Sequence, residues 1–194
     1  MTNTKNRPFE ATIPEGSRAM DFLEGADFHD TWGIEVQTRG RSALGLFIHA
    51  MACTPRWVDI CMDLRNRAGA LVGLKNLGRL ASVSNRKSDE DYQPGERVGI
   101  FTVFENSLEE ALIGDKDKHL DVFLCIHRAK ESTDGWALVR VTTIVHVKNA
   151  LGRLYMLPVR PMHRLIAPTV LGAFSGNRAS AIKYSASRDV APPR

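Results

Sequence analysis

Two consecutive segments near the middle of the chain, residues 119–130 and 136–148, alternate between two kinds of side chain with a period of two. Residues of one parity are nearly all aliphatic: Leu120, Val122, Leu124, Ile126, Val139, Val141, Val145 and Val147. Because successive side chains of a strand point to opposite faces of a sheet, this period predicts two strands with one packed face and one solvated face. The short turn at Thr133-Asp134-Gly135 joins neighbours that run antiparallel, so this part of the chain is expected to be a meander.

Other elements come before this meander. The same period of two predicts strands over residues 28–38, 98–105 and 108–114. After the first of these strands, apolar residues spaced by three and four predict two short helices. Ser42 and Thr54 are suited to cap the two helices, since their side-chain oxygens can accept from free backbone N–H groups.

A long helical stripe follows the last strand, from Leu151 to Phe174. Three prolines interrupt it, and each removes a hydrogen bond from inside the helix. We therefore expect a break near Pro158 to Pro161, with the better helix starting at Pro161. Because this stripe must be buried against the aliphatic face of the sheet, the order of elements predicts an α+β fold in which a curved antiparallel sheet grips a long C-terminal helix.

This layout resembles that of the START-like, or helix-grip, proteins. The resemblance implies a cavity between the sheet and the long helix, which apolar ligands usually occupy in that fold. The alternative is another α+β sandwich with no cavity. We expect one START-like domain over residues 27–176, preceded by an N-terminal arm over 1–26 and followed by a basic, disordered tail over 177–194.

Several short runs resemble the domain-of-unknown-function family 2867. They are Trp57, Leu64-Arg65-Asn66, Gly73-Leu74-Lys75, His119-Leu120-Asp121, Thr142-Thr143, Leu151-Gly152-Arg153-Leu154-Tyr155 and Pro161-Met162-His163-Arg164. The resemblance covers about residues 28–174, and the family's preference for an aromatic after the proline is not met at Met162. Members of this family occur alone and also fused to NAD(P)-binding domains that resemble short-chain dehydrogenases. The resemblance supports the fold and implies no activity.

Charge and cysteine content narrow the classes of function. The net charge is +4, but residues 177–194 hold four basic residues and one acidic residue, which leaves the rest of the chain at +1. A nucleic-acid-binding protein carries its basic face on the folded part, so no nucleic-acid partner is expected. Three cysteines without a C-x-x-C pair are typical of buried thiols in a reducing compartment. With no signal peptide and no membrane span in the sequence, the expected location is the cytoplasm.

Cofactor motifs are missing from the sequence. Gly73 and Gly78 have the spacing of a phosphate-binding loop, but Arg79-Leu80 follows in place of Lys-Ser/Thr. No G-x-G-x-x-G follows a predicted strand, so the chain is not expected to hold a dinucleotide in a Rossmann pocket. We expect neither a cofactor nor a metal ion.

Six residues are candidates for ligand binding. His119 and Asp121 lie on the same side of one predicted strand, where a histidine and a carboxylate could transfer a proton, although a charged pair beside a turn explains them as well. His163 lies at the edge of the C-terminal stripe, where it could contact a ligand or act as a general base. Arg65 could anchor an acidic group. The remaining two, Trp57 and Tyr155, belong either to the core or to a cavity wall.

These residues leave three hypotheses open. The first is a module that binds a small, mostly apolar molecule, with His163, His119 or Arg65 supplying polar contacts. The second is an enzyme of the same fold that uses the pair His119 and Asp121, or His163, for proton transfer. The third is an interaction domain that docks on a separate NAD(P)-dependent oxidoreductase. A homodimer stays open as a further state of assembly.

Overall fold

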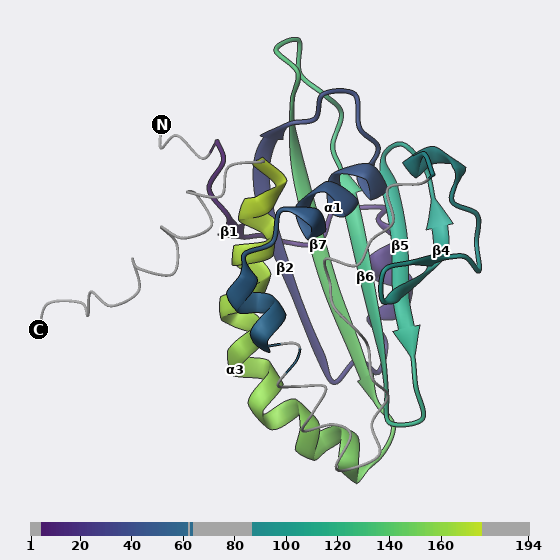
Figure 1. Ribbon diagram of the computed structural model, residues 1–194. Helices are drawn as coiled ribbons and strands as arrows, with labels where there is room; N and C mark the ends of the chain where they lie inside the picture. The colour runs from purple at the N-terminus through teal and green to yellow at the C-terminus, as the bar shows by residue number, and fades with distance from the viewer. Residues whose placement is uncertain (1–4, 62, 64–86, 176–194) are drawn as a thin grey trace, which may run out of the picture.

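A seven-stranded antiparallel sheet organises the chain and confirms the predicted α+β fold (Figure 1). The structure is a computed structural model that describes residues 5–61, 63 and 87–175. Its strands are β1 (Phe9–Glu10), β2 (Phe28–Gln37), β3 (Arg97–Val98), β4 (Phe101–Asn106), β5 (Glu110–Lys116), β6 (Leu120–Arg128) and β7 (Trp136–Val147). In the sheet they follow the order β1-β2-β7-β6-β5-β4-β3, which places the first long strand beside the last.

The aliphatic residues of β6 and β7 share one face of the sheet, as their parity predicts. Ile126 lies opposite Val141, and Val122 lies opposite Val145. The long C-terminal helix, α3 (Ala150–Gly172), packs against β2 and β7 on this face and continues into the 3-10 helix η3 (Ala173–Ser175). We call this face of the sheet the inner face.

The start of α3 lies very close to the sheet. Asn149 is the N-cap, and its side-chain oxygen accepts from the backbone N–H of Gly152 at 3.1 Å. A Cβ atom at residue 152 would lie 2.4 Å from the carbonyl oxygen of His119 and 2.9 Å from the side chain of Val147. Only glycine therefore allows the helix to leave the end of β7 at this distance.

The predicted break in α3 near Pro158 to Pro161 is wrong, since the helix runs unbroken from residue 150 to residue 172. Pro158 and Pro161 are both exposed, so their rings and the hydrogen bonds they remove lie on the side away from the sheet. Carbonyl groups freed on that side can bond to water. A helix that covers a core curves with its solvent side convex, so prolines on that side are compatible with one continuous helix.

Two helices follow β2, in agreement with the prediction. The first is α1 (Ala43–Ala52), whose N-cap Ser42 accepts from the N–H of Gly45 at 3.0 Å. Residues 56–61 and 63 form the described part of the second helix. Thr54, expected to cap this second helix, donates its hydroxyl to the carbonyl of Ala50 at the end of α1, at 2.9 Å.

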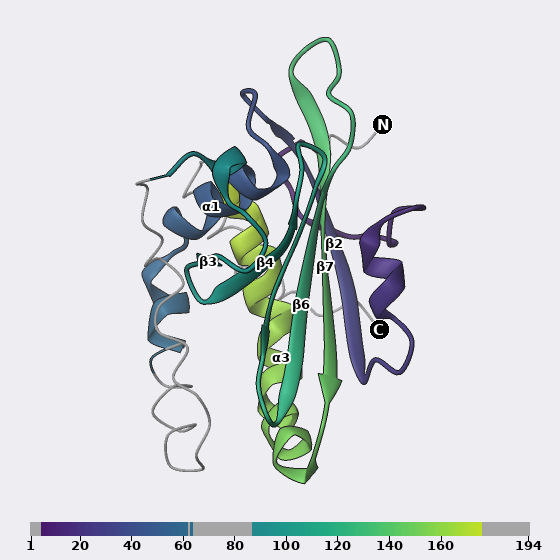
Figure 2. The ribbon, with the colours of Figure 1, turned by 90° about the vertical axis from the view of Figure 1, so that its right-hand side faces the viewer.

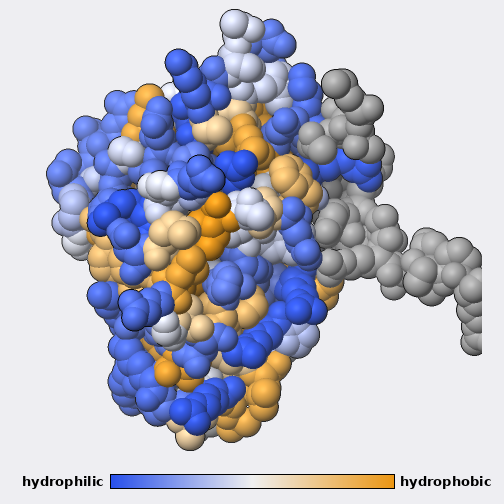
Figure 3. Space-filling view, turned by 180° about the vertical axis from the view of Figure 1, so that it is seen from behind, coloured by the Kyte–Doolittle hydropathy of each residue, from blue (hydrophilic) through white to orange (hydrophobic). Residues whose placement is uncertain are grey.

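The outer face of the sheet, which was predicted to be solvated, is covered by residues from the N-terminal part of the chain. The 3-10 helix η1 (Arg18–Phe22) lies on this side, opposite α3, as Figure 2 shows. Ala19 is fully buried there among Leu112, Phe123, Cys125 and Ile144. The outer face also carries polar residues. Burial under η1 removes the apolar side chains of this face from solvent, namely those of Phe123, Cys125 and Ile144. Seen from behind, the molecule is largely hydrophilic with a band of apolar side chains (Figure 3).

The N-terminal segment also joins the sheet itself. Residues 9–10 form β1, which pairs with β2 at the edge of the sheet.

A second 3-10 helix, η2 (Asp89–Asp91), lies beside α1, where Asp89 accepts from the hydroxyl of Ser42 at 2.6 Å. None of the described helices is long and apolar enough to cross a membrane.

Candidate functional site

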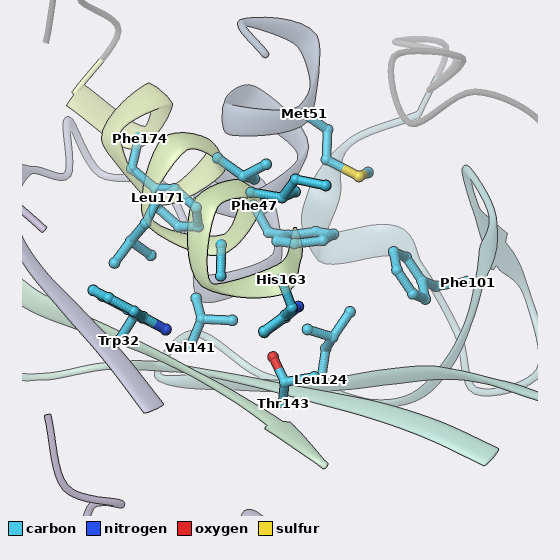
Figure 4. A pocket seen from close by; sticks show the side chains of 13 residues that line it. Trp32, Phe47, Met51, Phe101, Leu124, Val141, Thr143, His163, Leu171 and Phe174 are labelled. Atoms are coloured by element: carbon cyan, nitrogen blue, oxygen red, sulfur yellow. The ribbon is translucent and has the colours of Figure 1, made fainter. Parts of the chain in front are cut away.

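A cavity of about 120 Å³ lies between α3, α1 and the inner face of the sheet, and it is partly open to solvent (Figure 4). Most of its described lining is apolar, and two of the described lining residues, Thr143 and His163, are polar. The lining residues are Trp32, Phe47, Met51, Phe101, Leu124, Val141, Thr143, His163, Ile166, Ala167, Val170, Leu171 and Phe174. Such a lining offers a ligand burial of apolar surface and few hydrogen bonds.

Aromatic side chains from different elements form one wall of the cavity. The ring of Phe47, on α1, meets the ring of Phe101, on β4, with centroids 6.0 Å apart. It also meets the ring of Phe174, on η3, at 6.5 Å. Both contacts are edge-on, an arrangement that aromatic pairs favour. The wall is therefore built by residues that are far apart in the sequence.

The polar end of the cavity is organised around Asp30, on β2. Its Oδ1 atom lies 3.1 Å from Nε2 of His163, and its Oδ2 atom accepts from the indole N–H of Trp32 at 3.0 Å. The side chains of His163 and Asp30 are only 20 % and 21 % exposed. A buried carboxylate needs such partners, because burial without them is costly. This arrangement ties the middle of α3 to the first long strand.

His163 is further held by residues at the edge of the sheet. The ring of Phe28 meets its imidazole edge-on, with centroids 5.5 Å apart. One turn earlier in α3, Arg160 donates to the carbonyl of Asp27 at 2.9 Å. These contacts fix where the imidazole lies relative to the cavity.

Asp30 and Thr143 are part of the site, although neither was among the residues predicted from the sequence. Asp30 lies opposite Thr143 in the pairing of β2 with β7. Both point to the inner face, where each interrupts a row of apolar residues. The hydroxyl oxygen of Thr143 points from β7 toward the cavity (Figure 4). In the sequence, each is a polar residue at an inward position of a predicted strand, and this feature could have identified Asp30 and Thr143 as candidates.

Of the six predicted ligand-binding residues, the described lining of the cavity includes only His163. Tyr155 is half-buried near the start of α3, where it packs against Leu120, Val145 and Met156. Trp57 is half-buried on the second helix. Arg65 lies outside the described residues.

His119 and Asp121 contact different neighbours near the start of α3. Nδ1 of His119 lies 3.2 Å from the side-chain oxygen of Asn149. Asp121 forms an ion pair with Lys148 at 2.7 Å. Neither side chain lies in the described lining of the cavity.

A second polar cluster lies on the outer face, where it fastens residues 17–18 to the sheet. Oε1 of Glu110 accepts from the hydroxyl of Ser17 at 2.6 Å and from the thiol of Cys125 at 3.0 Å. Oε2 accepts from the backbone N–H of Arg18 at 3.2 Å. Although burial favours a higher pKa for Glu110, these hydrogen bonds outweigh it and hold the pKa below its usual value.

The thiol in this cluster is not suited to nucleophilic chemistry. Burial, together with the neighbouring carboxylate of Glu110, raises the pKa of Cys125 to about 12. Since the thiolate is the nucleophile, Cys125 is inert near neutral pH. A serine, a carboxylate and a cysteine in contact therefore serve to hold the N-terminal segment on the sheet.

We expect this thiol to make the protein less stable at alkaline pH. An unfolded cysteine ionises near its ordinary pKa of 9.0, whereas folded Cys125 keeps its proton up to about 12. The unfolded state therefore loses the proton first, and stability falls as pH rises through this interval, by about 1.4 kcal/mol per pH unit. Urea denaturation between pH 8 and pH 11 should show a steeper loss in the wild type than in Cys125→Ser. Equal slopes would contradict the raised pKa.

Within the described residues, no group of three or more histidine, cysteine, aspartate or glutamate side chains could hold a metal ion. Among these residues, the polar end of the cavity has the imidazole of His163, the hydroxyl of Thr143 and, behind the imidazole, the carboxylate of Asp30. What this arrangement can do is orient one polar group of a bound molecule.

Comparison with known proteins gives one match. The model of a protein family described as "Protein of unknown function (DUF2867)" matches residues 22–170. Searches of curated proteins and of solved structures give no significant match. The match agrees with the family resemblance seen in the sequence and adds no ligand or reaction.

Proposed function

The chain belongs to the DUF2867 family, whose function is unknown, and we propose from its own geometry that it binds a small, mostly apolar molecule in the cavity under α3. The apolar lining is the observation that carries this proposal. Ligand sites are typically concave and mostly apolar, with a few polar groups that set the orientation of the ligand. The cavity matches this description, with His163 and Thr143 as its polar groups.

The volume limits the size of the ligand. An engineered apolar protein cavity of about 150 Å³ binds benzene. A cavity of about 120 Å³ that is partly open is thus suited to a molecule with one six-membered ring. Each buried CH₂ group contributes about 0.8 kcal/mol, so a molecule of this size can bind without many hydrogen bonds.

Toluene provides a direct test of the proposal. A ligand that binds only the folded state raises stability by about 2.7 kcal/mol at a concentration of one hundred times its Kd. We expect the melting temperature of the purified protein to rise with toluene concentration, in the way this relation between ligand concentration and stability requires. A melting temperature that does not change up to saturating toluene would contradict the proposal. Native mass spectrometry of untreated protein can also reveal a molecule retained from the cell.

Proton transfer by His163 is a second candidate function, and the contact between His163 and Asp30 favours it. A carboxylate that accepts from one ring nitrogen can orient the imidazole as a base. Mass spectrometry of the retained molecule after incubation with the protein in D₂O separates the two functions. A binding module leaves the C–H bonds of its ligand unexchanged, whereas an enzyme that transfers protons introduces deuterium, and does so more slowly in the variant His163→Gln. Docking on a separate oxidoreductase, a homodimer and a cytoplasmic location rest on the sequence alone.

A further inference from the structure

The polar end of the cavity indicates which chemical class of ligand the protein takes. We propose that the ligand is a neutral, ring-sized molecule with one hydroxyl group, such as a phenol or a cyclic alcohol, whose hydroxyl meets Thr143 and His163. This inference rests on the proposed function, because it requires that the cavity bind a small molecule. It specifies in addition that the ligand is neutral, that it carries one hydroxyl group, and how it is oriented in the cavity.

The charges around the cavity favour a neutral ligand. None of the described residues that line the cavity is lysine, arginine, aspartate or glutamate. At the polar end, the carboxylate of Asp30 lies in contact with His163. A ligand with a carboxylate would lose its hydration and would face the charge of Asp30 across the imidazole. A neutral ligand avoids both costs.

The donors and acceptors at the polar end of the cavity favour a hydroxyl group on the ligand. Asp30 holds Nε2 of His163, so in the neutral imidazole the proton is placed on Nε2 and Nδ1 becomes the acceptor. The hydroxyl of Thr143 can donate or accept. A ligand group that both donates and accepts fits this pair best, and a hydroxyl does both. A carbonyl or an ether only accepts.

The positions of His163 and Thr143 favour one orientation of the ligand. His163, on α3, and Thr143, on β7, approach the cavity from opposite sides, and Phe47 and Phe101 contribute aromatic rings to the lining (Figure 4). A single ring can therefore contact apolar side chains while its one substituent lies between the helix and the strand. The oxygens of Asp30 already bond His163 and Trp32, so these two partners are fixed before the ligand binds. Such preorganisation reduces the cost of binding.

Phenol and toluene form the matched pair that tests the inference, since they differ by a hydroxyl in place of a methyl group. Phenol gives up hydrogen bonds to water when it is buried, so a uniformly apolar cavity would prefer toluene. We expect phenol to bind about three- to tenfold more tightly than toluene in isothermal titration calorimetry at pH 7, where phenol is neutral. Benzoate is expected to bind more weakly than either.

A variant assigns the preference to the proposed end of the cavity. Thr143→Val keeps the shape of the side chain and removes the hydroxyl. It should weaken phenol binding by about three- to tenfold and leave toluene within about twofold. Thr102→Val, on β4, is the matched control, because Thr102 lies outside the described lining of the cavity, and it should change neither affinity.

Three outcomes would overturn the inference. They are toluene binding as tightly as phenol, benzoate binding more tightly than phenol, and Thr143→Val leaving phenol affinity unchanged. Binding of toluene with no preference for phenol would leave the proposed function intact and refute this inference alone. If none of the three molecules binds, the proposed function itself fails. The comparison of phenol with toluene in the wild type needs no variant to fold.

Discussion

Ala167→Leu is expected to weaken the binding of toluene and phenol more than tenfold while the protein stays folded. Ala167 lies on α3 in the lining of the cavity, so three additional carbon atoms at this position extend into the space for a ligand. Filling a cavity commonly raises stability by about 0.5–2 kcal/mol, because the added atoms are buried without displacing others. We expect affinity for either ring to fall more than tenfold and the melting temperature to stay level or rise.

The control for this variant is the same substitution at Ala150. Ala150 is the first residue of α3 and is exposed, so Ala150→Leu adds the same atoms to the same helix outside the cavity. It should leave ring binding unchanged. If Ala167→Leu binds toluene as tightly as the wild type, the ligand does not occupy this cavity. A lower melting temperature would show instead that the cavity wall cannot accept the larger side chain.

Removing the carboxylate of Glu131 is expected to cost the fold about 3 kcal/mol. Glu131 pairs with Arg128, whose side chain is only 7 % exposed at the end of β6. It also accepts from the hydroxyl of Thr38 at 2.6 Å. Glu131→Ala leaves a buried guanidinium without its carboxylate, and this is the costly way to break a buried ion pair. For a chain of this length the loss corresponds to a fall of about 6–12 °C in Tm.

Two further variants make this prediction specific. Replacing both partners, in Arg128→Met combined with Glu131→Ala, should recover most of the loss, since no charge is then left buried. Glu96→Ala breaks the exposed ion pair with Lys87 and should change stability far less. Calorimetry of the three proteins checks both statements. If Glu131→Ala and Glu96→Ala cost the same, the burial of Arg128 has no energetic consequence.

Much of the fold could be predicted because the strands and helices differ in period. The alternation in residues 119–130 and 136–148 identified β6 and β7, and the parity of their aliphatic residues identified the inner face. Ser42 was recognised as an N-cap because a serine before a stripe of helical spacing satisfies a free N–H. These features depend on residues close in the sequence, so the sequence contains the information needed to find them.

The features that were missed depend on contacts between distant segments. The hydrophobic period of residues 9–22 gave no reason to place them against the sheet. The strand β1 is only two residues long, and η1 covers the outer face with few apolar side chains. The break in α3 was predicted from its prolines without knowing that Pro158 and Pro161 face away from the sheet. Local rules for proline do not include this choice of side.

The candidate site was only partly predictable for the same reason. His163 was selected for its position on the helical stripe, but its partner Asp30 lies 133 residues away in the chain. Asp30 and Thr143 are each one polar residue in an apolar row, and neither is unusual alone. Their pairing in register across β2 and β7 makes them one polar end. That pairing follows from the order of strands in the sheet.

The position of Trp32 gives the protein an intrinsic fluorescent probe of its own cavity. Its indole ring forms part of the lining, and its N–H group is held by Asp30, so both the polarity around the ring and its hydrogen bond respond to what lies beside it. The chain has two other tryptophans, Trp57 and Trp136, neither of which lies in the described lining. With both replaced by phenylalanine, emission from the remaining indole would report occupancy directly, without a label and in real time.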